Sequence, residues 1–321
     1  MYPRISDLIN DFFGTDINLP VQTYGFFLAM AFISGGLVLY FELRRKEREK
    51  IIFPQEKIHI KGKKERVIEL VYPRQLTSSI ILVAAVSGII GSKLFDVIEH
   101  LDQLIKDPVH TLFSFSGLAF YGGLITAAFA VSIYVERNKI PWPVNTDAVA
   151  PALMLAYGIG RIGCQLSGDG CWGMVNAEPK PMWLSFLPDW LWAYHYPHNV
   201  INEGILIPGC TGRNCHVLDQ AVFPTPIYET TIAFLFFGLL WFLRKKIKIH
   251  GILFSIYLIL NGTERFFVEQ LRVNIRYDFL GMKVTQASFI AIMLILAGIG
   301  SIFYFKWRNR KRSIKTMTNE T

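Results

Sequence analysis

The sequence lacks the short motifs that identify two of the commonest hydrolase classes. It contains neither a G-x-S-x-G nucleophile elbow nor an H-E-x-x-H zinc motif. His195, His198 and His216 lie in one polar segment, but their spacing matches no recognisable metal-ligand pattern. We therefore expect no hydrolase of these classes, no metal and no other cofactor.

The sequence also has little charge, and its N-terminal residues include no basic cluster. Charged residues make up 18% of the 321 residues, whereas hydrophobic residues make up 52% and aromatic residues 14%. This composition is far from that of a soluble domain. Asp7, Asp11 and Asp16 stand where a secretory signal has Lys or Arg, so we expect no cleavable signal peptide.

The net charge of +8 has two interpretations, and the positions of the basic residues decide between them. A basic patch on a folded surface would indicate nucleic acid. Here the basic residues cluster in short loops between apolar runs, which is the positive-inside pattern of membrane proteins. We expect contact with membrane lipid and none with nucleic acid.

Seven apolar runs have about the length that a helix needs to cross a bilayer. The expected spans are residues 21–41, 79–98, 111–135, 147–166, 227–243, 250–269 and 284–305. Basic clusters follow the first, third, fifth and seventh spans, which predicts an external N-terminus and a cytoplasmic C-terminus. The fold class is therefore an all-α integral membrane protein with seven transmembrane helices.

The rest of the chain is assigned by its lack of such runs. Residues 167–226 are polar, aromatic and Pro-rich, and they form the one larger external segment. The charged loop 42–78 contains IIFP and ERVIELVYP, which predict a short strand pair. No internal repeat is apparent, so residues 1–321 are expected to form a single polytopic membrane domain.

The sequence GIGRIGCQLSGDGCWG, residues 158–173, places Arg161 inside the fourth span. A guanidinium group at this depth costs a few kcal/mol, so it must face a partner or a wet cavity. The glycines allow a helix or a ligand to approach the backbone, and the turn around Asp169 leaves backbone N–H groups free. These features predict an anion site. The alternative is that Arg161 pairs with an acid and only pins two helices together.

The sixth span carries further polar residues. Asn261, Arg265 and Glu269 are spaced four apart and share one helix face. Glu269 is able to neutralise Arg265 within its own helix, and Arg161 then needs another partner, for which we considered Asp169, Glu229 and Asp96. Two arginines in the outward halves of their spans favour a shared phosphate, because guanidinium groups bind phosphate oxygens in pairs. Phospholipid head groups are the phosphates available at that depth.

Three tyrosines, Tyr24, Tyr121 and Tyr228, lie in apolar surroundings. A tyrosine there is usually an interfacial residue without further function. Tyr121 differs because Gly122 and Gly123 follow it, and we expect them to clear space beside its hydroxyl group.

The four cysteines fall into two pairs. Cys164 and Cys171 flank the turn after the fourth span, whereas Cys210 and Cys215 lie in the external segment as CTGRNC. On an oxidising side of the membrane, the second pair is able to form a small disulfide loop.

Landmarks along the chain resemble those of the bacterial prolipoprotein diacylglyceryl transferases. They are, in order, TYGFFLAM, GSKLF, GLAFYGGLI, DAVAPALMLAYGIGRIGCQLSGDGCWG, PTPIYE, RFFVEQLR and TQAS. One Gly-Arg pattern alone would be weak evidence. Seven landmarks in order, on a matching seven-span topology, are strong evidence for the family.

The resemblance implies a transferase in the bacterial cytoplasmic (inner) membrane. Its partners would be phosphatidylglycerol and the signal peptide of a preprolipoprotein, whose lipobox cysteine thiol receives the diacylglyceryl group while glycerol phosphate leaves. Arg161 and Arg265 match the two arginines that the family uses near the head group. Tyr24 matches a tyrosine of the first span, Gly173 the glycine that closes the signature, and Glu269 the acid after the second arginine.

The chain departs from the family pattern at four other positions. Many members have His where this chain has Tyr121, and the family asparagine after the first arginine is Cys164 here. The signature glutamate becomes Asp169, and the tyrosine before the second arginine becomes Asn261. Since a phenol is a poor base at neutral pH, our hypothesis is that Tyr121 positions the head group or relays a proton. The two arginines would then favour the thiolate.

The sequence thus predicts two overlapping groups of site residues. The predicted catalytic residues are Arg161, Arg265, Tyr121, Asp169 and Glu269. The predicted substrate-binding residues are Tyr24, Arg161, Gly173, Cys164, Asn261 and Tyr228. The competing hypothesis is a protein of the same fold that binds or moves an anionic phospholipid without covalent chemistry. An anion transporter is disfavoured by the lack of an inverted repeat.

Overall fold

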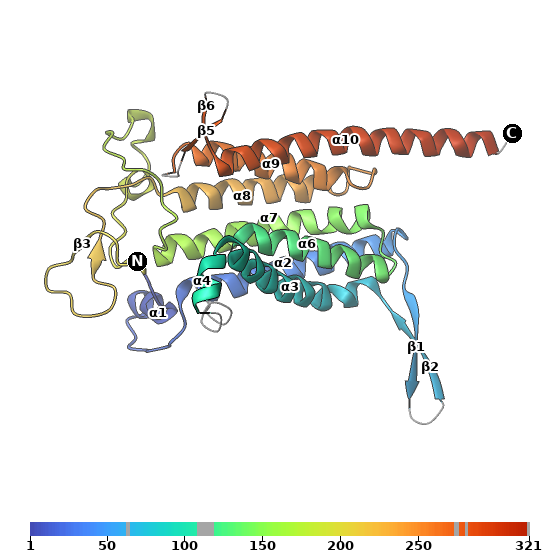
Figure 1. Cartoon of the computed structure of the whole chain (residues 1–321), viewed down its shortest axis with the longest axis horizontal. Coiled ribbons are helices and arrows are strands. Elements are labelled where there is room, and N and C mark those ends of the chain that lie inside the picture. Colours follow the sequence, from blue (N-terminus) through green and yellow to red (C-terminus); the bar gives the residue numbers. More distant parts are fainter. Residues whose placement is uncertain (62–64, 108–118, 273–275, 280–281, 320–321) are drawn as a thin grey trace. The chain divides into compact units, whose positions relative to one another are not determined.

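The computed structural model describes residues 1–61, 65–107, 119–272, 276–279 and 282–319 (Figure 1). The chain divides into two compact units, which are Met1–Gly35 with Val149–Thr321, and Gly36–Ala148. Helices α2 (Thr23–Arg48) and α7 (Trp142–Ser167) contribute residues to both units. The single membrane domain therefore stays a prediction, and each unit is described by itself.

Five helices in the described part of the chain are long and apolar enough to cross a membrane. They are Thr23–Arg48, Pro73–Glu99, Trp142–Ser167, Thr225–Leu243 and Gln286–Lys311. The chain is therefore a helical protein with several membrane-spanning segments. Seven spans and the orientation of the termini stay predictions, because the third and sixth predicted spans are not among the five.

The third and sixth predicted spans differ from the others for identifiable reasons. Helix α6 (Phe120–Arg137) covers only part of the predicted residues 111–135, whose beginning lies outside the described residues. Helix α9 (Ile252–Glu269) matches the predicted residues 250–269 but carries three charged side chains, Glu264, Arg265 and Glu269. The charge that lowers the hydropathy of α9 is the same charge that makes it of functional interest.

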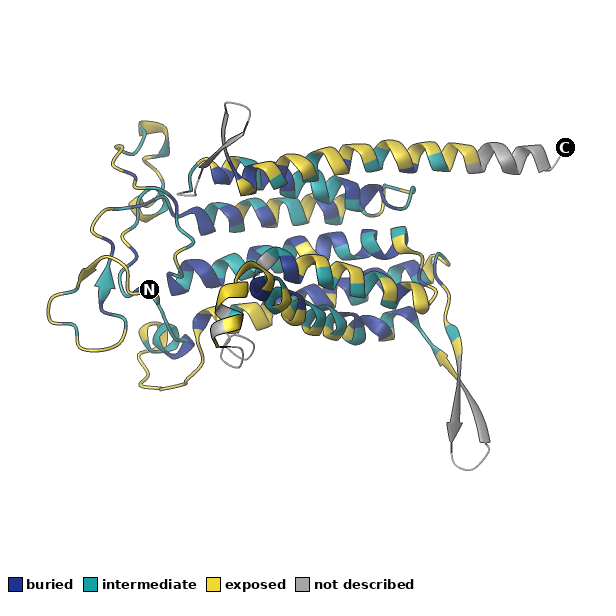
Figure 2. Ribbon diagram, viewed as in Figure 1, coloured by how far each residue is buried: buried dark blue, intermediate teal, exposed yellow. Residues whose placement is uncertain are grey.

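In the first unit, α8 (Thr225–Leu243), α9 and α10 (Gln286–Asn319) run side by side (Figure 1). The buried core between α7, α8 and α9 contains Met154, Ala233, Leu240 and Leu253. Along α10, apolar side chains such as Phe289, Met293 and Leu296 are exposed at helical spacing (Figure 2). A stripe of this kind is typical of a helix that faces lipid.

The segment that follows α7 folds over the end of that helix. It contains two short 3₁₀ helices and a two-residue strand pair, β3 (Ile205–Leu206) with β4 (His216–Val217). The fully buried Tyr196 donates a hydrogen bond to Gln165 at 2.6 Å, and Val200 N donates to Ser167 O at 3.1 Å. These contacts hold the segment against the end of α7 that carries Arg161.

The first residues of the chain form a short helix, α1 (Ile5–Phe13), that the sequence analysis did not predict. Two backbone hydrogen bonds hold this helix in place. Tyr2 N donates to Leu166 O of α7 at 2.8 Å, and Ile5 N donates to Val21 O. The chain before the first long helix is thus tied to the end of α7.

In the second unit, α3 (Thr77–Glu99) packs closely against α6. A Cβ atom at Gly122 would lie 2.8 Å from Gly91 O, and one at Gly91 would lie 2.7 Å from Gly122 O. At Gly123 a Cβ would meet the Ser92 hydroxyl group. Helix α3 therefore fills the space next to these two glycines. That they clear space beside the Tyr121 hydroxyl group stays a prediction.

The second unit also contains the predicted strand pair. Strand β1 (Gln55–Lys61) pairs antiparallel with β2 (Glu65–Val71). The second strand matches the predicted ERVIELV, whereas the first begins just after IIFP rather than within it. A third pair, β5 (Arg276–Phe279) with β6 (Met282–Thr285), lies between α9 and α10 in the sequence.

Candidate active site

Helix α7 carries Arg161 close to α8 and α2, because small residues on α7 let these two helices approach. A Cβ at Gly158 would lie 3.0 Å from the Phe234 ring of α8, and one at Gly163 would lie 2.9 Å from Phe27 Cβ of α2. Gly160 has no such neighbour within 4 Å. The prediction that glycines of this helix allow a close approach is therefore confirmed at Gly158 and Gly163.

Arg161 forms an ion pair with Glu229 of α8. Its Nε contacts Glu229 Oε2, and its guanidinium carbon lies 5.2 Å from the centre of the Tyr157 ring. Arg272 Nη1 lies 3.6 Å from Glu229 Oε1. The Glu229 side chain is fully buried, whereas the two arginine side chains are 16% and 15% exposed. One buried carboxylate therefore faces two guanidinium groups, and Glu229 is one of the three partners considered for Arg161.

Tyr157 Oη lies between two carboxyl groups, at 2.7 Å from Glu229 Oε2 and 3.1 Å from Glu264 Oε1. A hydroxyl group has one proton, so it donates to one carboxylate and must accept from the other group. Tyr157 donates across the shorter distance to Glu229, which faces the two guanidinium groups. The contacts of Tyr157 with Glu229 and Glu264 join α7, α8 and α9.

Arg265 pairs with Glu269 on its own helix. The distance from Arg265 Nη2 to Glu269 Oε2 is 3.2 Å, and the Glu269 side chain is fully buried. The predicted shared face is confirmed, and the contact is the within-helix pairing that we considered as an alternative. Asn261 lies one turn before Arg265 and is half-buried, and among the described residues it makes no hydrogen bond to the cluster.

Among the described residues, the ion pairs of this region join three guanidinium groups to two carboxylates. Arg161 and Arg272 pair with Glu229, and Arg265 pairs with Glu269. Both Arg161 and Arg265 act electrostatically on Glu264, so we treat these groups as one cluster. Buried charges of this kind are costly unless they are paired, and guanidinium groups are suited to a ligand with negative charge.

The turn after α7 depends on glycine. Gly168 and Gly170 have φ of 65° and 85°, a left-handed conformation that other residues rarely adopt. Within this turn, Asp169 Oδ1 accepts a hydrogen bond from Cys171 N at 3.2 Å. Asp169 therefore shapes the turn, and its carboxylate also hydrogen-bonds the side chain of Cys171.

Gly173 closes the turn at a point where three segments meet. Gly173 N donates to Phe223 O at 2.8 Å, and Met174 N donates to Leu271 O at 2.7 Å. A Cβ at Gly173 would lie 2.6 Å from Leu271 O and 2.9 Å from Thr225 Cγ2. The structure thus gives a packing reason for glycine at this predicted site position.

A cavity of about 550 Å³ opens beside this turn. Its lining includes Gly173, Trp172, Glu203, Asp219 and Arg272. Because Arg272 also pairs with Glu229, the cavity reaches the charged cluster. Its walls combine polar residues with the apolar Val175, Leu218 and Val222, so it offers room for a substrate that has polar and apolar parts.

The remaining predicted residues lie outside the cluster. Tyr24 stands at the start of α2 beside Gly163 and is 41% exposed. Tyr228 donates to Leu191 O at 2.6 Å and so anchors the external segment to α8. Tyr121 belongs to α6 of the second unit. Their roles in substrate binding or catalysis stay predictions.

Sequence reasoning missed Tyr157, and it missed the role of Glu264. Tyr157 precedes Arg161 by four residues and therefore shares its helix face, which was an available signal. Glu264 is adjacent to Arg265 in the sequence, so the two side chains point to different sides of the helix. Its partner lies on another helix, so spacing within one helix gave no indication of it.

The comparisons with known proteins are consistent across the chain. A family model described as prolipoprotein diacylglyceryl transferase matches residues 12–304. The chain is similar to the phosphatidylglycerol–prolipoprotein diacylglyceryl transferase of Clostridium tetani, with 31% identity over 221 residues, covering 68% of this chain and 76% of the relative. A relative of the same name from Leptospira interrogans is 25% identical over 361 aligned positions, covering 97% of this chain and 96% of the relative.

Proposed function

This chain belongs to the prolipoprotein diacylglyceryl transferase family, and we propose that it transfers the diacylglyceryl group of phosphatidylglycerol to the lipobox cysteine of a preprolipoprotein. A carbon–sulfur bond forms at the glyceryl carbon, and the bond from that carbon to the phosphate oxygen breaks. The thiol loses its proton, and the leaving phosphate oxygen gains one. The products are a thioether and glycerol phosphate.

The charge of the buried cluster is the observation that carries this proposal. The phosphodiester of phosphatidylglycerol has one negative charge, which suits a cluster in which three guanidinium groups pair with two carboxylates. Arginine suits this role because its planar group presents paired donors to phosphate oxygens. The lipid phosphate would therefore complete the cluster that Arg161, Arg265 and Arg272 form.

The two predicted arginines would also act on the transition state. As the carbon–oxygen bond breaks, negative charge grows on the leaving phosphate, and cations already in place stabilise it without rearranging. Removing one such group costs about 3–4 kcal/mol in enzymes that stabilise oxyanions. The same positive field favours the thiolate of the incoming cysteine.

Glu264 is suited to supply the proton that the leaving oxygen needs. Its carboxyl group lies 3.1 Å from the hydroxyl group of Tyr157, which is one helical turn from Arg161. In the proposed mechanism this carboxyl group is protonated before the reaction. After transfer, the proton released by the incoming thiol would restore the carboxyl group, so the step is balanced. Tyr121 keeps its proposed role of positioning the head group or relaying a proton.

The remaining predicted residues are proposed to bind substrate rather than to react. Tyr24 and Cys164 lie at the Arg161 end of α7, and Gly173 lines the cavity that reaches Arg272. We place Asp169, Glu269, Asn261 and Tyr228 around them as positioning residues. The preprolipoprotein signal peptide would approach from within the membrane, with its cysteine at the cluster.

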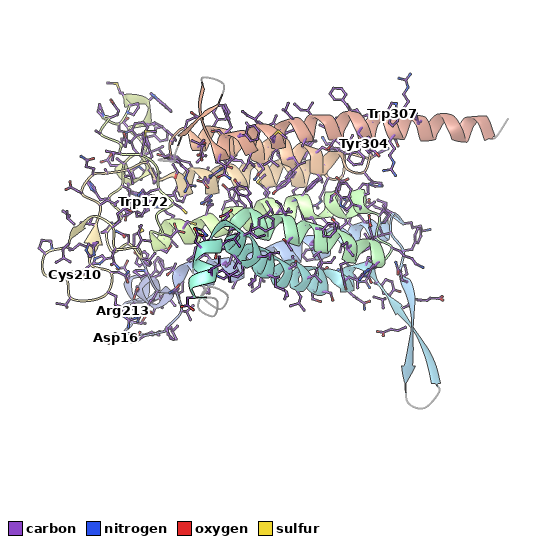
Figure 3. All side chains as sticks on the ribbon, in the orientation of Figure 1. Asp16, Trp172, Cys210, Arg213, Tyr304 and Trp307 are labelled. Carbon is purple, nitrogen blue, oxygen red and sulfur yellow. A yellow bond between two sulfur atoms is a disulfide. The ribbon has the colours of Figure 1, made fainter. Side chains whose placement is uncertain are left out.

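We also propose the location and orientation expected from the sequence. The chain would cross the bacterial cytoplasmic membrane seven times, with the segment 167–226 outside and the C-terminus inside. The disulfide between Cys210 and Cys215 supports an external location for that segment. At the other end, α10 carries Tyr304, Trp307 and Lys311 (Figure 3), and Lys311 Nζ lies 4.0 Å from the Trp307 ring, as expected at a cytoplasmic interface.

The test is transfer to a defined peptide. Purified chain in phosphatidylglycerol vesicles would be mixed with a lipobox peptide that contains cysteine, or serine at the same position. Mass spectrometry should show the diacylglyceryl adduct on the cysteine peptide alone, with release of glycerol phosphate. Vesicles of phosphatidylcholine are the lipid control. Phosphatidylglycerol binding without transfer, by folded protein, would contradict this function and favour the lipid-binding alternative.

A further inference from the structure

Two free cysteines lie together beside Arg161. Cys164 is buried on the last turns of α7, and Cys171 is half-buried in the turn that follows. Their sulfur atoms and a carboxylate oxygen of Asp169 all lie within 4.8 Å of one another. The two thiols are also in hydrogen-bonding contact. Neither thiol reacts in the proposed transfer, in which Cys164 is only a substrate-binding residue and Cys171 has no role.

The surroundings of the pair make one of the thiols reactive. The hydrogen bond from Cys164 lowers the pKa of Cys171, so its thiolate forms at lower pH than in an ordinary cysteine. Arg161 Nη1 lies 4.0 Å from Cys164 Sγ and places a positive charge beside the pair. The thiolate is the species that attacks a disulfide, and positive surroundings increase its population.

The pair shares its side of the membrane with an existing disulfide. Cys210 and Cys215 are joined by a disulfide bond in the segment that follows Cys171. Among residues 168–224, all of which the structure describes, no helix is long and apolar enough to cross a membrane. Trp172, next to Cys171, and Cys210 both lie in this segment (Figure 3). Disulfides persist in oxidising compartments, so Cys164 and Cys171 face the same conditions.

We propose that Cys164 and Cys171 form a reversible disulfide that switches the transferase between a reduced, active form and an oxidised, slower form. The proposal rests on the proposed function and orientation. In the oxidation, each thiol loses one proton and one electron, and a sulfur–sulfur bond forms. The two electrons and two protons pass to the disulfide of an external thiol–disulfide oxidoreductase, which leaves as a dithiol.

The contacts of the pair connect it to the phosphate cluster. Cys164 Sγ accepts from Arg161 Nη1, and moving this sulfur into a disulfide bond would disturb that contact. The Cys171 carbonyl oxygen accepts from Thr225 Oγ1 at 2.9 Å, and Thr225 begins the helix that carries Glu229. Joining the two sulfurs would pull this turn toward α7 and shift both partners of the Arg161–Glu229 pair. A displacement of this kind should slow transfer by about tenfold or more.

The first part of the test maps the bond itself. The full chain would be equilibrated in glutathione buffers of graded redox potential, acid-quenched, alkylated without reduction, digested and analysed by mass spectrometry. We expect a peptide pair linked through Cys164 and Cys171 that grows with oxidation. Complete alkylation of both thiols at the most oxidising potential would overturn the proposal.

The second part follows transfer in the same samples. Activity should fall as the linked fraction rises and should return after dithiothreitol. Cys171→Ser should keep the reduced activity and lose the response, whereas the double change Cys210→Ser and Cys215→Ser should keep the response. A Cys171→Ser variant that responds as the unchanged chain does would overturn the switch.

The bond and the proposed function fail in distinguishable ways. Linkage is read by mass, so a linked chain that shows no transfer in either form would contradict the function while the disulfide itself is established. Zinc content should be measured on the purified chain as well. Stoichiometric zinc that is lost in Cys171→Ser would identify the cluster with Asp169 as a metal site and overturn the switch.

Discussion

Two glycine-rich helix contacts, one in each unit, differ in what they hold. In the second unit, Gly122 of α6 and Gly91 of α3 bring backbone against backbone. In the first unit, Gly158 and Gly163 bring α7 against α8 and α2, and the same helix carries Arg161 into an ion pair with Glu229. Both regions have the sequence signature of closely packed membrane helices.

The difference shows that a glycine in a membrane-spanning helix indicates the close approach of another helix. It does not by itself indicate a catalytic or binding site. The glycines after Tyr121 serve packing, and that they also clear space beside its hydroxyl group stays a prediction. What distinguishes the first unit is a set of buried ion pairs, in which Glu229 and Glu269 face its arginines. The following predictions test whether the two contacts are as different as this comparison holds.

The largest expected effect is that of Glu229→Gln. The change removes the carboxylate that faces Arg161 and Arg272, and breaking a buried ion pair costs about 3–5 kcal/mol. Thermal unfolding in detergent should show this loss, and transfer should fall with it. Glu178→Gln, at an exposed position, is the matched control. An unchanged unfolding temperature for Glu229→Gln would mean that solvent, not Glu229, balances these arginines.

Tyr157→Phe should mainly affect the reaction. The change leaves the Glu264 proton without its acceptor, and loss of a positioned proton donor lowers kcat by about a hundredfold. Tyr196→Phe is the control, because Tyr196 is a buried tyrosine that hydrogen-bonds Gln165 instead. We expect that control to lower stability and leave kcat close to the original. Equal kcat for Tyr157→Phe and the unchanged chain would remove Glu264 from the mechanism.

Replacing a close-packed glycine by alanine in each unit compares the two helix contacts directly. Gly122→Ala and Gly173→Ala each introduce a Cβ within 3 Å of backbone atoms, and overpacking of this kind costs about 1–3 kcal/mol. Both variants should unfold at lower temperature. At permissive temperature only Gly173→Ala should also raise the KM for lipid.

Gly160→Ala is the control for both, since no atom lies within 4 Å of the added Cβ. It should unfold at the original temperature or slightly above it. If Gly122→Ala changed KM as much as Gly173→Ala does, the contrast between the two contacts would be wrong.

The smallest expected effect is that of Tyr121→Phe. Losing one hydrogen-bonding hydroxyl group should cost about 0.5–1.5 kcal/mol, which corresponds to a few-fold loss of transfer. The rate of transfer should be measured from about pH 5 to about pH 9, a range in which thiol and raised carboxyl pKa values fall. Full activity at every pH would end the proposed role of Tyr121.

Much of the site could be predicted because it depends on spacing along one helix. Arg265 and Glu269 lie four apart, and their contact follows from helical geometry. Arg161 needed a partner at membrane depth, and Glu229 was one of three acids considered. The choice among them depends on which helices pack together, and the sequence does not state that.

The parts that were missed depend on tertiary contacts. Tyr157 is one aromatic residue among many in an apolar helix, and only the approach of α8 and α9 gives its hydroxyl group two carboxyl partners. The position of Glu264 next to Arg265 shows that the two side chains point apart on the helix, but it does not show which residue of another helix Glu264 contacts. Helix α1 was missed because its short amphipathic run precedes the first long apolar one.

The most direct test of the account compares three arginines in the transfer reaction with phosphatidylglycerol and a lipobox peptide. Arg161→Ala and Arg265→Ala change the cluster, whereas Arg213→Ala changes an exposed arginine of the external segment (Figure 3). The account predicts that each of the first two lowers kcat/KM by about a hundredfold or more, in folded protein, while the third leaves it unchanged. Transfer that survives both cluster changes would contradict the claim that these buried arginines hold the lipid phosphate.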